Sequence, residues 1–301
     1  MKRFICCCIV LAGIFLGTAW AEEGLIKLTD RIYTYAGTKN PSPANSFGAN
    51  AGIVIGDKGV LVVDSLVSGK EAKRLLADIR KITDKPIRYV VDTHNHFDHT
   101  FGNSEFATLG AVIVAHDNCS ENMRVSSKQV LDNAESYGLN ADEAKEIKIA
   151  YPNVSTANGM HIGLGGISVD LIYVAPSHTD DSIMIFIPEE KVVFAGDVLF
   201  TDYYPFMGTG TIEGWVKTLE KLNEMDADRI IPGHGPLSTK KDVAAMKEFI
   251  LAFDKAAKEI CAKPGDPAEM AEKVKKAVPE RPLADFLIMA SLQAKYLKAG
   301  N

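Results

Sequence analysis

The sequence predicts an α/β fold with a helical extension at its C-terminal end, on three observations. Strand-like runs recur through the first two-thirds of the 301 residues, and amphipathic helical patterns lie between some of them. After His234 the pattern changes to apolar residues at helical spacing. Hydrophobic residues make up 47% of the chain and charged residues 24%, as in an ordinary globular protein. We therefore expect one α/β domain over residues 22–240 and a helical extension over residues 241–301.

Seven runs rich in apolar and β-branched residues predict strands, and a short eighth run covers Arg229–Ile231. In chain order the seven are Ala51–Ile55, Val60–Val63, Ile87–Asp92, Ala111–Ala115, Ile167–Val174, Ile183–Ile187 and Lys191–Ala195. The connection Pro188-Glu189-Glu190 between the last two is typical of a hairpin.

Helical periodicity lies between and after these strands. The segments Gly69–Ile82, Glu213–Met225 and Lys241–Ala262 carry apolar side chains on one face. The segment Lys128–Pro152 is expected to be helical, with breaks at Gly138 and at its final proline.

Two further helices are expected after a turn at residues 263–266. The apolar residues of the extension are predicted to form a core or dimer contacts; they include Phe249, Phe253, Phe286, Met289 and Leu292. Nearer the N-terminus, a Pro/Asn/Ser-rich loop of residues 37–45 ends near Phe47 and is a candidate flap over a site.

The first 21 residues have the pattern of a secretory signal peptide. Lys2 and Arg3 form a basic start, an apolar run extends from Phe4 to Leu16, and Ala19-Trp20-Ala21 is typical of a cleavage site. The apolar run is short for a membrane span. We therefore expect a secreted or periplasmic protein with no stable membrane insertion after cleavage; the alternative is an uncleaved N-terminal anchor.

The charge of the chain argues against one class of partner. Loss of Lys2 and Arg3 with the signal would change the formal charge from −6 to −8. An acidic chain without a basic cluster does not fit a nucleic-acid backbone, so the expected partner is a small-molecule substrate. Cleavage would leave Cys119 and Cys261, and the sequence leaves open whether they pair.

Three of the seven histidines fall within the segment His94-Asn95-His96-Phe97-Asp98-His99. This segment follows a predicted strand, and residues two apart in extended chain project to the same side. His94 and His96 are therefore expected to share one metal ion, whereas Asp98 and His99 can reach a second. Imidazole and carboxylate ligands suit zinc, and less often iron or manganese.

Three later residues are candidate ligands at strand ends. His178, Asp197 and His234 each follow a predicted strand and are flanked by small or turn residues. Such neighbours let the backbone approach a common centre. With the four ligands of the first segment they make seven, enough for two metal ions with open positions for water.

These motifs resemble those of the metallo-β-lactamase superfamily of hydrolases. His94, His96, Asp98 and His99 match its H-x-H-x-D-H motif, and the three later ligands match its downstream motifs in the right order. The resemblance covers about Leu25 to Ser238. It implies a four-layer αββα sandwich with the metals at one edge between the two sheets.

The resemblance also implies a role for each ligand. His94, His96 and His178 would bind the first of two zinc ions; Asp98, His99 and His234 would bind the second; Asp197 would bridge both. Zinc lowers the pKa of bound water toward neutrality, so that metal-bound hydroxide can attack a carbonyl. Asp98 would orient this nucleophile or accept its proton.

Other residues near the motifs have less specific signals. Asp92 is either a hydrogen-bond partner for a ligand imidazole or an ordinary strand-end carboxylate. His116 and His161 are expected to have core or surface roles and not to bind metal. The residues after Asp197 either line an apolar substrate pocket or pack under a loop; these are Tyr203, Tyr204, Phe206 and Met207.

Asp197 bears on the substrate. Secreted zinc β-lactamases of this architecture usually place Cys or Ser at this position, whereas thioesterase-, lactonase- and nuclease-type relatives use a bridging Asp. The acidic charge disfavours a nuclease. Thioesterases of the glyoxalase type carry C-terminal helices, but we find no basic cluster here to receive their substrate.

We therefore expect an exported dinuclear zinc hydrolase of a small ester, lactone, thioester or amide. The alternatives are a zinc β-lactamase, a mononuclear iron sulfur dioxygenase that uses ligands such as His94, His96 and His178, and a non-catalytic metal-binding or redox-relay accessory protein. The fold leaves this choice open.

Overall fold

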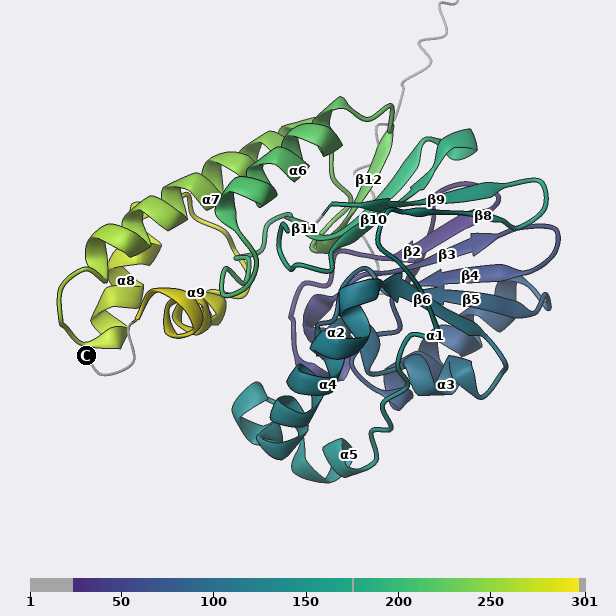
Figure 1. The fold of residues 1–301 in the computed structure, drawn as a ribbon, viewed down its shortest axis with the longest axis horizontal. Coiled ribbons are helices and arrows are strands. Elements are labelled where there is room, and N and C mark those ends of the chain that lie inside the picture. Colours follow the sequence, from purple (N-terminus) through teal and green to yellow (C-terminus); the bar gives the residue numbers. More distant parts are fainter. Residues whose placement is uncertain (1–23, 175, 298–301) are drawn as a thin grey trace, which may run out of the picture.

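The computed structural model describes residues 24–174 and 176–297. The expected signal segment, residues 1–21, lies outside them. Within the described residues, two β-sheets pack face to face and carry helices on both outer faces (Figure 1). This confirms the four-layer αββα sandwich with C-terminal helices.

The first sheet has seven strands in sequence order, the early pairs antiparallel and the later ones parallel. They are β1 Leu25–Lys27, β2 Ile32–Tyr35, β3 Ala51–Ile55, β4 Val60–Val63, β5 Ile87–Val91, β6 Val112–His116 and β7 Val154–Thr156.

The second sheet has five strands in the order β12-β11-β10-β9-β8. They are β8 Met160–Gly163, β9 Ser168–Tyr173, β10 Ile183–Ile187, β11 Val192–Phe200 and β12 Arg229–His234. The strands β11 and β12 are parallel, with register shifts near Gly196.

Helices cover the first sheet and surround the ends of its strands. They are the turn η1 Pro43–Gly48 and the helices α1 Gly69–Ile82, α2 Phe97–Thr100, α3 Asn103–Ala107, α4 Asp117–Asp132, η2 Ala134–Tyr137 and α5 Ala141–Lys145. Helix α1 begins at the N-cap Ser68, whose side chain accepts a hydrogen bond from the Glu71 amide. Its buried residues Ala72, Leu75 and Ile79 pack in the core beneath the first sheet.

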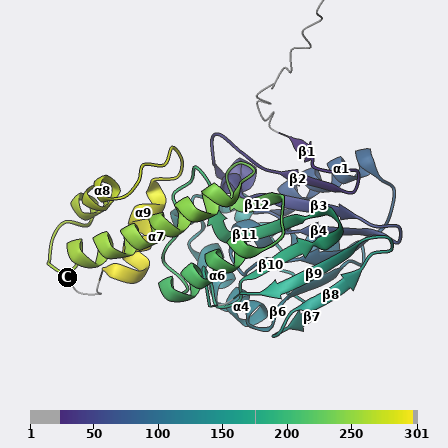
Figure 2. The same ribbon diagram turned by 90° about the horizontal axis from the view of Figure 1, so that it is seen from above.

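Helices α6 Ile212–Glu224 and α7 Lys240–Ile260 cover the second sheet. The turn η3 Pro188–Glu190 joins β10 to β11, and the chain ends with α8 Pro267–Ala277, α9 Phe286–Ser291 and the π-helical turn η4 Leu292–Tyr296. Both views place α8 and α9 to one side of the two sheets (Figures 1 and 2). No described helix is both long and apolar enough to cross a membrane.

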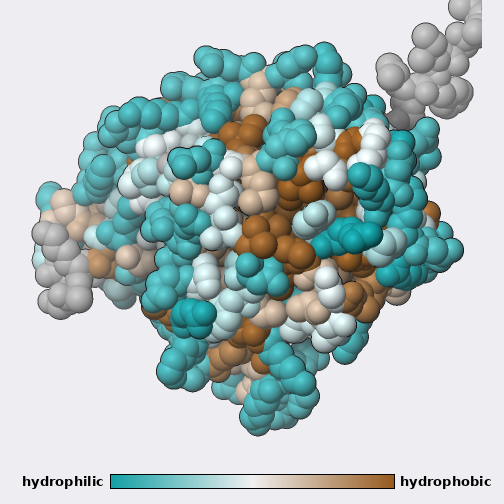
Figure 3. All heavy atoms as spheres, turned by 45° about the vertical axis from the view of Figure 1, so that its right-hand side comes forward, coloured by the Kyte–Doolittle hydropathy of each residue, from teal (hydrophilic) through white to brown (hydrophobic). Residues whose placement is uncertain are grey.

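Apolar side chains form a core in each interlayer space. The core between the two sheets contains residues of both, such as Leu61, Val91, Ile185 and Phe194. The core of the second sheet continues into the C-terminal helices, where Phe249, Phe253 and Leu292 are fully buried, whereas Phe286 is 52% exposed. From the strand side, hydrophobic side chains form a band through an otherwise largely hydrophilic face (Figure 3).

The structure corrects several predicted boundaries. Strand β11 runs past Asp197 to Phe200, and β12 includes His234, so these two ligands lie within strands and not after them. Helix α4 begins at Asp117, eleven residues before the predicted segment, and the helical region ends at Lys145. Strands β1, β2, β7 and β8 are three or four residues long, too short for a clear alternating pattern. Cys119 and Cys261 are both free thiols.

Candidate metal centre

All seven predicted ligands meet at one edge of the sandwich, and both sheets supply them. His94 and His96 follow β5, while Asp98 and His99 belong to the single turn of α2. The other three come from the second sheet: His178 from the turn between β9 and β10, Asp197 from β11 and His234 from the end of β12. The side chains form two groups, one of His94, His96, His178 and Asp197 and the other of Asp98, His99 and His234.

The first group surrounds one oxygen of Asp197. Its Oδ2 lies 3.3 Å from His178 Nε2 and 3.6 Å from His94 Nε2. His178 Nε2 lies 3.1 Å from His96 Nδ1. The ligand atoms of this group therefore face one point.

The second group surrounds the other oxygen of the same carboxylate. Asp197 Oδ1 lies 3.2 Å from His99 Nε2 and 3.5 Å from His234 Nε2. Asp98 Oδ2 lies 3.3 Å from His234 Nε2 and 3.7 Å from His99 Nε2. Asp197 is thus the residue that the two groups share.

These spacings fit metal ions better than direct hydrogen bonds. Zinc–nitrogen and zinc–oxygen bonds of about 2.0–2.1 Å place neighbouring ligands of a tetrahedron roughly 3.3–3.4 Å apart. The measured separations scatter around that edge length. Within the described residues, His94 Nε2 and Asp197 Oδ1 are buried and have no hydrogen-bond partner, which is costly unless a cation satisfies them.

The electrostatics of the site also favour a cation. Burial lowers the pKa of His94, and lowers that of His178 to about 3, so both imidazoles are in the neutral form that binds metals. Burial opposes the ionisation of Asp197, but the facing imidazoles of His234 and His99 hold its pKa well below the usual range. Burial likewise opposes a charge on His99. The neighbouring carboxylates, of which Asp197 has the largest effect, outweigh burial and raise the pKa of His99 well above the ordinary value.

Asp64 orients His99 and was not among the predicted site residues. Its Oδ2 lies 2.8 Å from His99 Nδ1, and its carboxylate also accepts hydrogen bonds from the backbone N–H and hydroxyl of Thr93. Asp64 has a φ of 59°, a left-handed conformation that aspartate tolerates better than most residues. The available signal was its place directly after the predicted strand Val60–Val63.

Asp92 does not orient a ligand imidazole, so this alternative for it is wrong. Its Oδ2 accepts a hydrogen bond from Asn103 Nδ2 at 2.8 Å, and its side chain is fully buried. Asp92 N donates to Val114 O, which attaches the residue after β5 to β6. The carboxylate next to the ligand cluster in the sequence is therefore not the one that contacts it in space.

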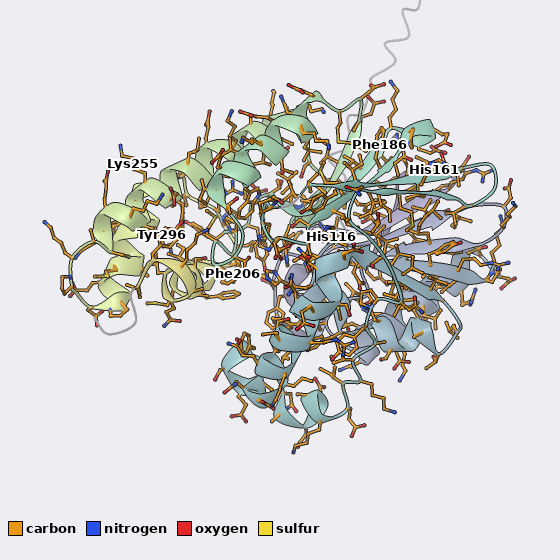
Figure 4. The ribbon with its side chains drawn as sticks, in the orientation of Figure 1. His116, His161, Phe186, Phe206, Lys255 and Tyr296 are labelled. Atoms are coloured by element: carbon orange, nitrogen blue, oxygen red, sulfur yellow. The ribbon has the colours of Figure 1, made fainter. Side chains whose placement is uncertain are left out.

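The site opens to solvent on the side of His96 and Asp98, the two of its seven side chains that are not fully buried. Phe206 borders this opening: its ring centroid lies 5.8 Å from that of His96, and Figure 4 shows it between the C-terminal helices and the strand ends. A Cβ on Gly208 would lie 2.3 Å from the Phe206 ring, so this glycine lets the ring fold over the backbone. On another side, Phe47 packs edge-on against Phe97 at 5.7 Å.

Of the four residues that the sequence offered as lining for an apolar substrate pocket, three lie in the core. Tyr203, Tyr204 and Met207 are each 1% exposed or less, so only Phe206 of the four remains available to line a pocket. The loop that ends near Phe47 packs beside the site, and the hydroxyl of Tyr203 donates a hydrogen bond to the Phe47 carbonyl.

The two remaining histidines have other contacts. His116 accepts a hydrogen bond from the Asn118 amide, and its ring stacks on Tyr173 with centroids 4.2 Å apart. His161 lies far out on β8 (Figure 4) and pairs with Asp170 at 2.7 Å. Neither belongs to the two ligand groups.

Comparison with known proteins places the chain in a family. The family model described as the metallo-beta-lactamase superfamily matches residues 44–234, which include all seven ligands. A linear primary-alkylsulfatase of a Pseudomonas species is 26% identical over 222 residues, which cover 62% of this chain and 41% of that protein. A type 2 metallo-beta-lactamase of Elizabethkingia meningoseptica is 24% identical over 78% of this chain and 88% of its own length.

A solved structure is similar over most of the chain. The stereoselective inverting sec-alkylsulfatase from a Pseudomonas species aligns with a TM-score of 0.65 and 19% identity, over 93% of this chain and 51% of that one. The chain thus spans about half or less of the two alkylsulfatases it resembles. The family model, the two ligand groups and the four-layer fold agree: the chain belongs to the metallo-β-lactamase superfamily.

Proposed function

We propose that the chain is a dinuclear zinc hydrolase of a small ester, lactone, thioester or amide. The observation that carries this proposal is the position of the Asp197 carboxylate between the two groups of ligands. Its Oδ2 faces one group and its Oδ1 faces the other. A carboxylate that joins two ligand sets is suited to a pair of ions roughly 3.5–4 Å apart.

The residues around the opening fit hydrolysis. Two zinc ions bound here would make a water molecule acidic enough to react near neutral pH and would polarise the bond to be cleaved. Asp98 is 14% exposed at the opening, and its pKa is lowered: burial opposes the charge, but His99 and His234 outweigh burial. An ionised Asp98 can orient a water molecule or accept its proton.

Two features of the site support a substrate with an apolar group. The half-buried ring of Phe206 lies beside His96 at the opening. Phe97, which belongs to the ligand segment, forms an edge-on pair with Phe47. Aromatic faces of this kind bind apolar groups mainly by removing them from water. Asp197 disfavours β-lactam cleavage, because secreted zinc β-lactamases usually have Cys or Ser at this position.

A sulfate ester is a second candidate substrate, favoured by a specific observation. Two of the similar proteins are named as alkylsulfatases, and the solved one aligns with 93% of this chain. Alignment over that share has to include most of the helices that follow His234. An alkyl sulfate would also present an apolar chain to Phe206.

Metal analysis and a substrate panel test the proposal together. Purified protein should contain about two zinc ions per chain, and it should hydrolyse at least one of a set of aryl esters, lactones, thioesters, β-lactams and alkyl sulfates. One iron ion, no zinc and consumption of oxygen with a persulfide substrate would identify a sulfur dioxygenase instead. Two zinc ions without turnover of any compound would favour a non-catalytic accessory protein.

We also propose that the chain is exported. The basic start, the apolar run and the Ala19-Trp20-Ala21 pattern support cleavage before Glu22. Mass spectrometry of the protein from the producing cell tests this: the expected product begins at Glu22, and an intact N-terminus would contradict it.

A further inference from the structure

The imidazole of His234 is held differently from that of His99, the other histidine of the second group. A metal-ligating histidine usually donates its second ring nitrogen to a carboxylate, carbonyl or water, and this fixes the ring. His99 has such a partner in Asp64, at 2.8 Å. Within the described residues, His234 Nδ1 is buried without a hydrogen-bond partner. Some other contact has to set the orientation of its ring.

Two aromatic rings make that contact. Phe200 stacks on His234 with ring centroids 5.1 Å apart and planes inclined by only 3°. Tyr203 packs against the same imidazole at 4.9 Å and 36°. Both aromatic side chains are 1% exposed. The direction of His234 Nε2 therefore depends on where the backbone holds Phe200 and Tyr203.

Arg281 holds the backbone at both of these residues. Its Nη1 donates to the carbonyl of Phe200 at 2.8 Å and to that of Tyr203 at 3.2 Å. The guanidinium lies over the Phe249 ring of α7, 4.4 Å from its centroid. Burial lowers the pKa of Arg281 to about 10, so the side chain is still charged at neutral pH. A charged donor bound to two carbonyls makes stronger hydrogen bonds than a neutral one.

Arg281 comes from the C-terminal extension, in the link between α8 and α9. The same link pairs with the segment after β11, because the Tyr204 amide donates to Leu283 O at 2.9 Å. The extension thus binds the backbone of the two aromatic residues that flank His234. Arg281 lies about eighty residues after these two aromatic residues in the sequence.

We propose that Arg281 is a positioning residue for the second metal ion: it fixes the aromatic pair that orients His234. The first ion depends on it less. His178 is also near Phe200, at 5.7 Å, but it has support of its own from Trp215 at 5.0 Å and from Thr209, whose hydroxyl donates to the His178 carbonyl at 2.7 Å. This inference rests on the proposed dinuclear site.

Zinc titration of metal-free protein against a chromophoric chelator tests the inference without any substrate. The variants are Arg281→Ala and, in case it does not fold, Arg281→Lys, which keeps the charge but loses the planar two-carbonyl grip. Lys273→Ala is the matched control, because Lys273 is exposed on α8 and pairs at 3.6 Å with Glu269 of the same helix, without a contact to the link that carries Arg281.

We expect the Arg281 variants to bind the second zinc ion at least tenfold more weakly, within the range typical of lost ligand support, and the first within about threefold of wild type. The control should bind both ions as wild type does. Equal weakening of the two ions, or none, would overturn the inference and leave Arg281 a purely structural residue. If wild type itself binds a single ion, the dinuclear proposal and this inference fail together; two ions in wild type with unchanged variants overturn the inference alone.

Discussion

The imidazoles of the site show two ways to orient a ligand. His99 and His94 have polar partners for Nδ1, the carboxylate of Asp64 and the hydroxyl of Thr93, at 2.8 and 3.0 Å. His178 and His234 have buried Nδ1 atoms without such partners in the described part of the chain, and aromatic rings surround them instead. A hydrogen bond tunes the basicity of a ligand as well as its direction, whereas ring packing fixes direction alone.

Asp64→Asn should weaken binding of the second zinc ion. The amide keeps the shape of the side chain but removes the charge that faces His99 Nδ1, so we expect a 10–100-fold loss of affinity, the range typical of such partners. Zinc titration against a chelator measures it. Asp57→Asn is the control, because Asp57 is 60% exposed and pairs with Arg31 on the surface. Wild-type affinity in Asp64→Asn would show that the contact with His99 has no such role.

Zinc affinity should rise with pH. In the metal-free chain burial opposes a proton on His99, but Asp197 and Asp98 outweigh burial and raise its pKa well above the usual value. Below that raised pKa the imidazole holds a proton that must leave before Nε2 can bind metal. The affinity for the second ion should therefore increase about tenfold per pH unit until the pKa is passed. Calorimetry in two buffers of different ionisation enthalpy measures the proton released; binding without proton release would contradict this.

Phe206→Ala should alter selectivity among substrates. The ring borders the opening beside His96, so its loss should lower kcat/KM for esters of long acyl chains by about tenfold, with less than about threefold change for acetyl esters. Phe286→Ala is the control, since Phe286 is 52% exposed on α9. A similar loss for short and long chains would mean that Phe206 does not contact the acyl group.

At the scale of elements, the ligand set depends on how closely β11 approaches β12. A Cβ on Gly233 would lie 1.9 Å from Asp197 Oδ1, and a Cβ on Gly196 would lie 2.7 Å from Thr93 Cβ. Gly196 also has a φ of 53°, where the register of β11 and β12 shifts. Gly233 lets β12 lie close beside β11 at Asp197, and Gly196 lets β11 approach Thr93, which follows β5 of the other sheet.

The sequence predicted the main strands and helices well where a run was long and one face was apolar. It could not show that Asp197 lies inside a strand, because the irregularity at Gly196 interrupts the local pattern of β11 and is compensated by pairing with β12. The ligands themselves were recognisable because four of them fall within six residues and the other three match the family's downstream motifs in the right order. Asp64 and Arg281 act through contacts 35 and about 80 residues away, which no local pattern encodes.

Gly233→Ala should damage both stability and metal binding. The added methyl group meets the carboxylate and the backbone nitrogen of Asp197, so β12 has to shift; we expect about 1–3 kcal/mol lower free energy of unfolding and zinc content well below wild type. Denaturant unfolding and metal analysis measure these. Gly163→Ala is the control, because nothing lies within 4 Å of its added Cβ. Full zinc content in Gly233→Ala would show that metal binding does not depend on the close approach of β12 to Asp197.

At the scale of the whole molecule, the two ligand groups join sheets that pack through an apolar core and a few hydrogen bonds, such as those from Ile183 N to Thr93 O and from Asn50 N to Gly233 O. One segment that follows β5 of the first sheet and three segments of the second sheet meet at the ligand groups. The C-terminal extension reaches the same edge through Arg281 and continues the core of the second sheet. The fold therefore places the site where movement between the sheets would separate its ligands.

Zinc should consequently stabilise the whole chain and not only a local loop. Ions that bind the folded state alone add about 2.7 kcal/mol at a free concentration a hundred times their dissociation constant. Chelation should therefore lower the midpoint of a single cooperative transition, measured by thermal unfolding with and without zinc. In His234→Ala, where one ligand of the second group is lost, the zinc-induced shift should shrink, while His161→Ala, outside the site, should keep it in full. An equal shift in both variants would mean that zinc stabilises the fold from somewhere other than the edge where the two sheets meet.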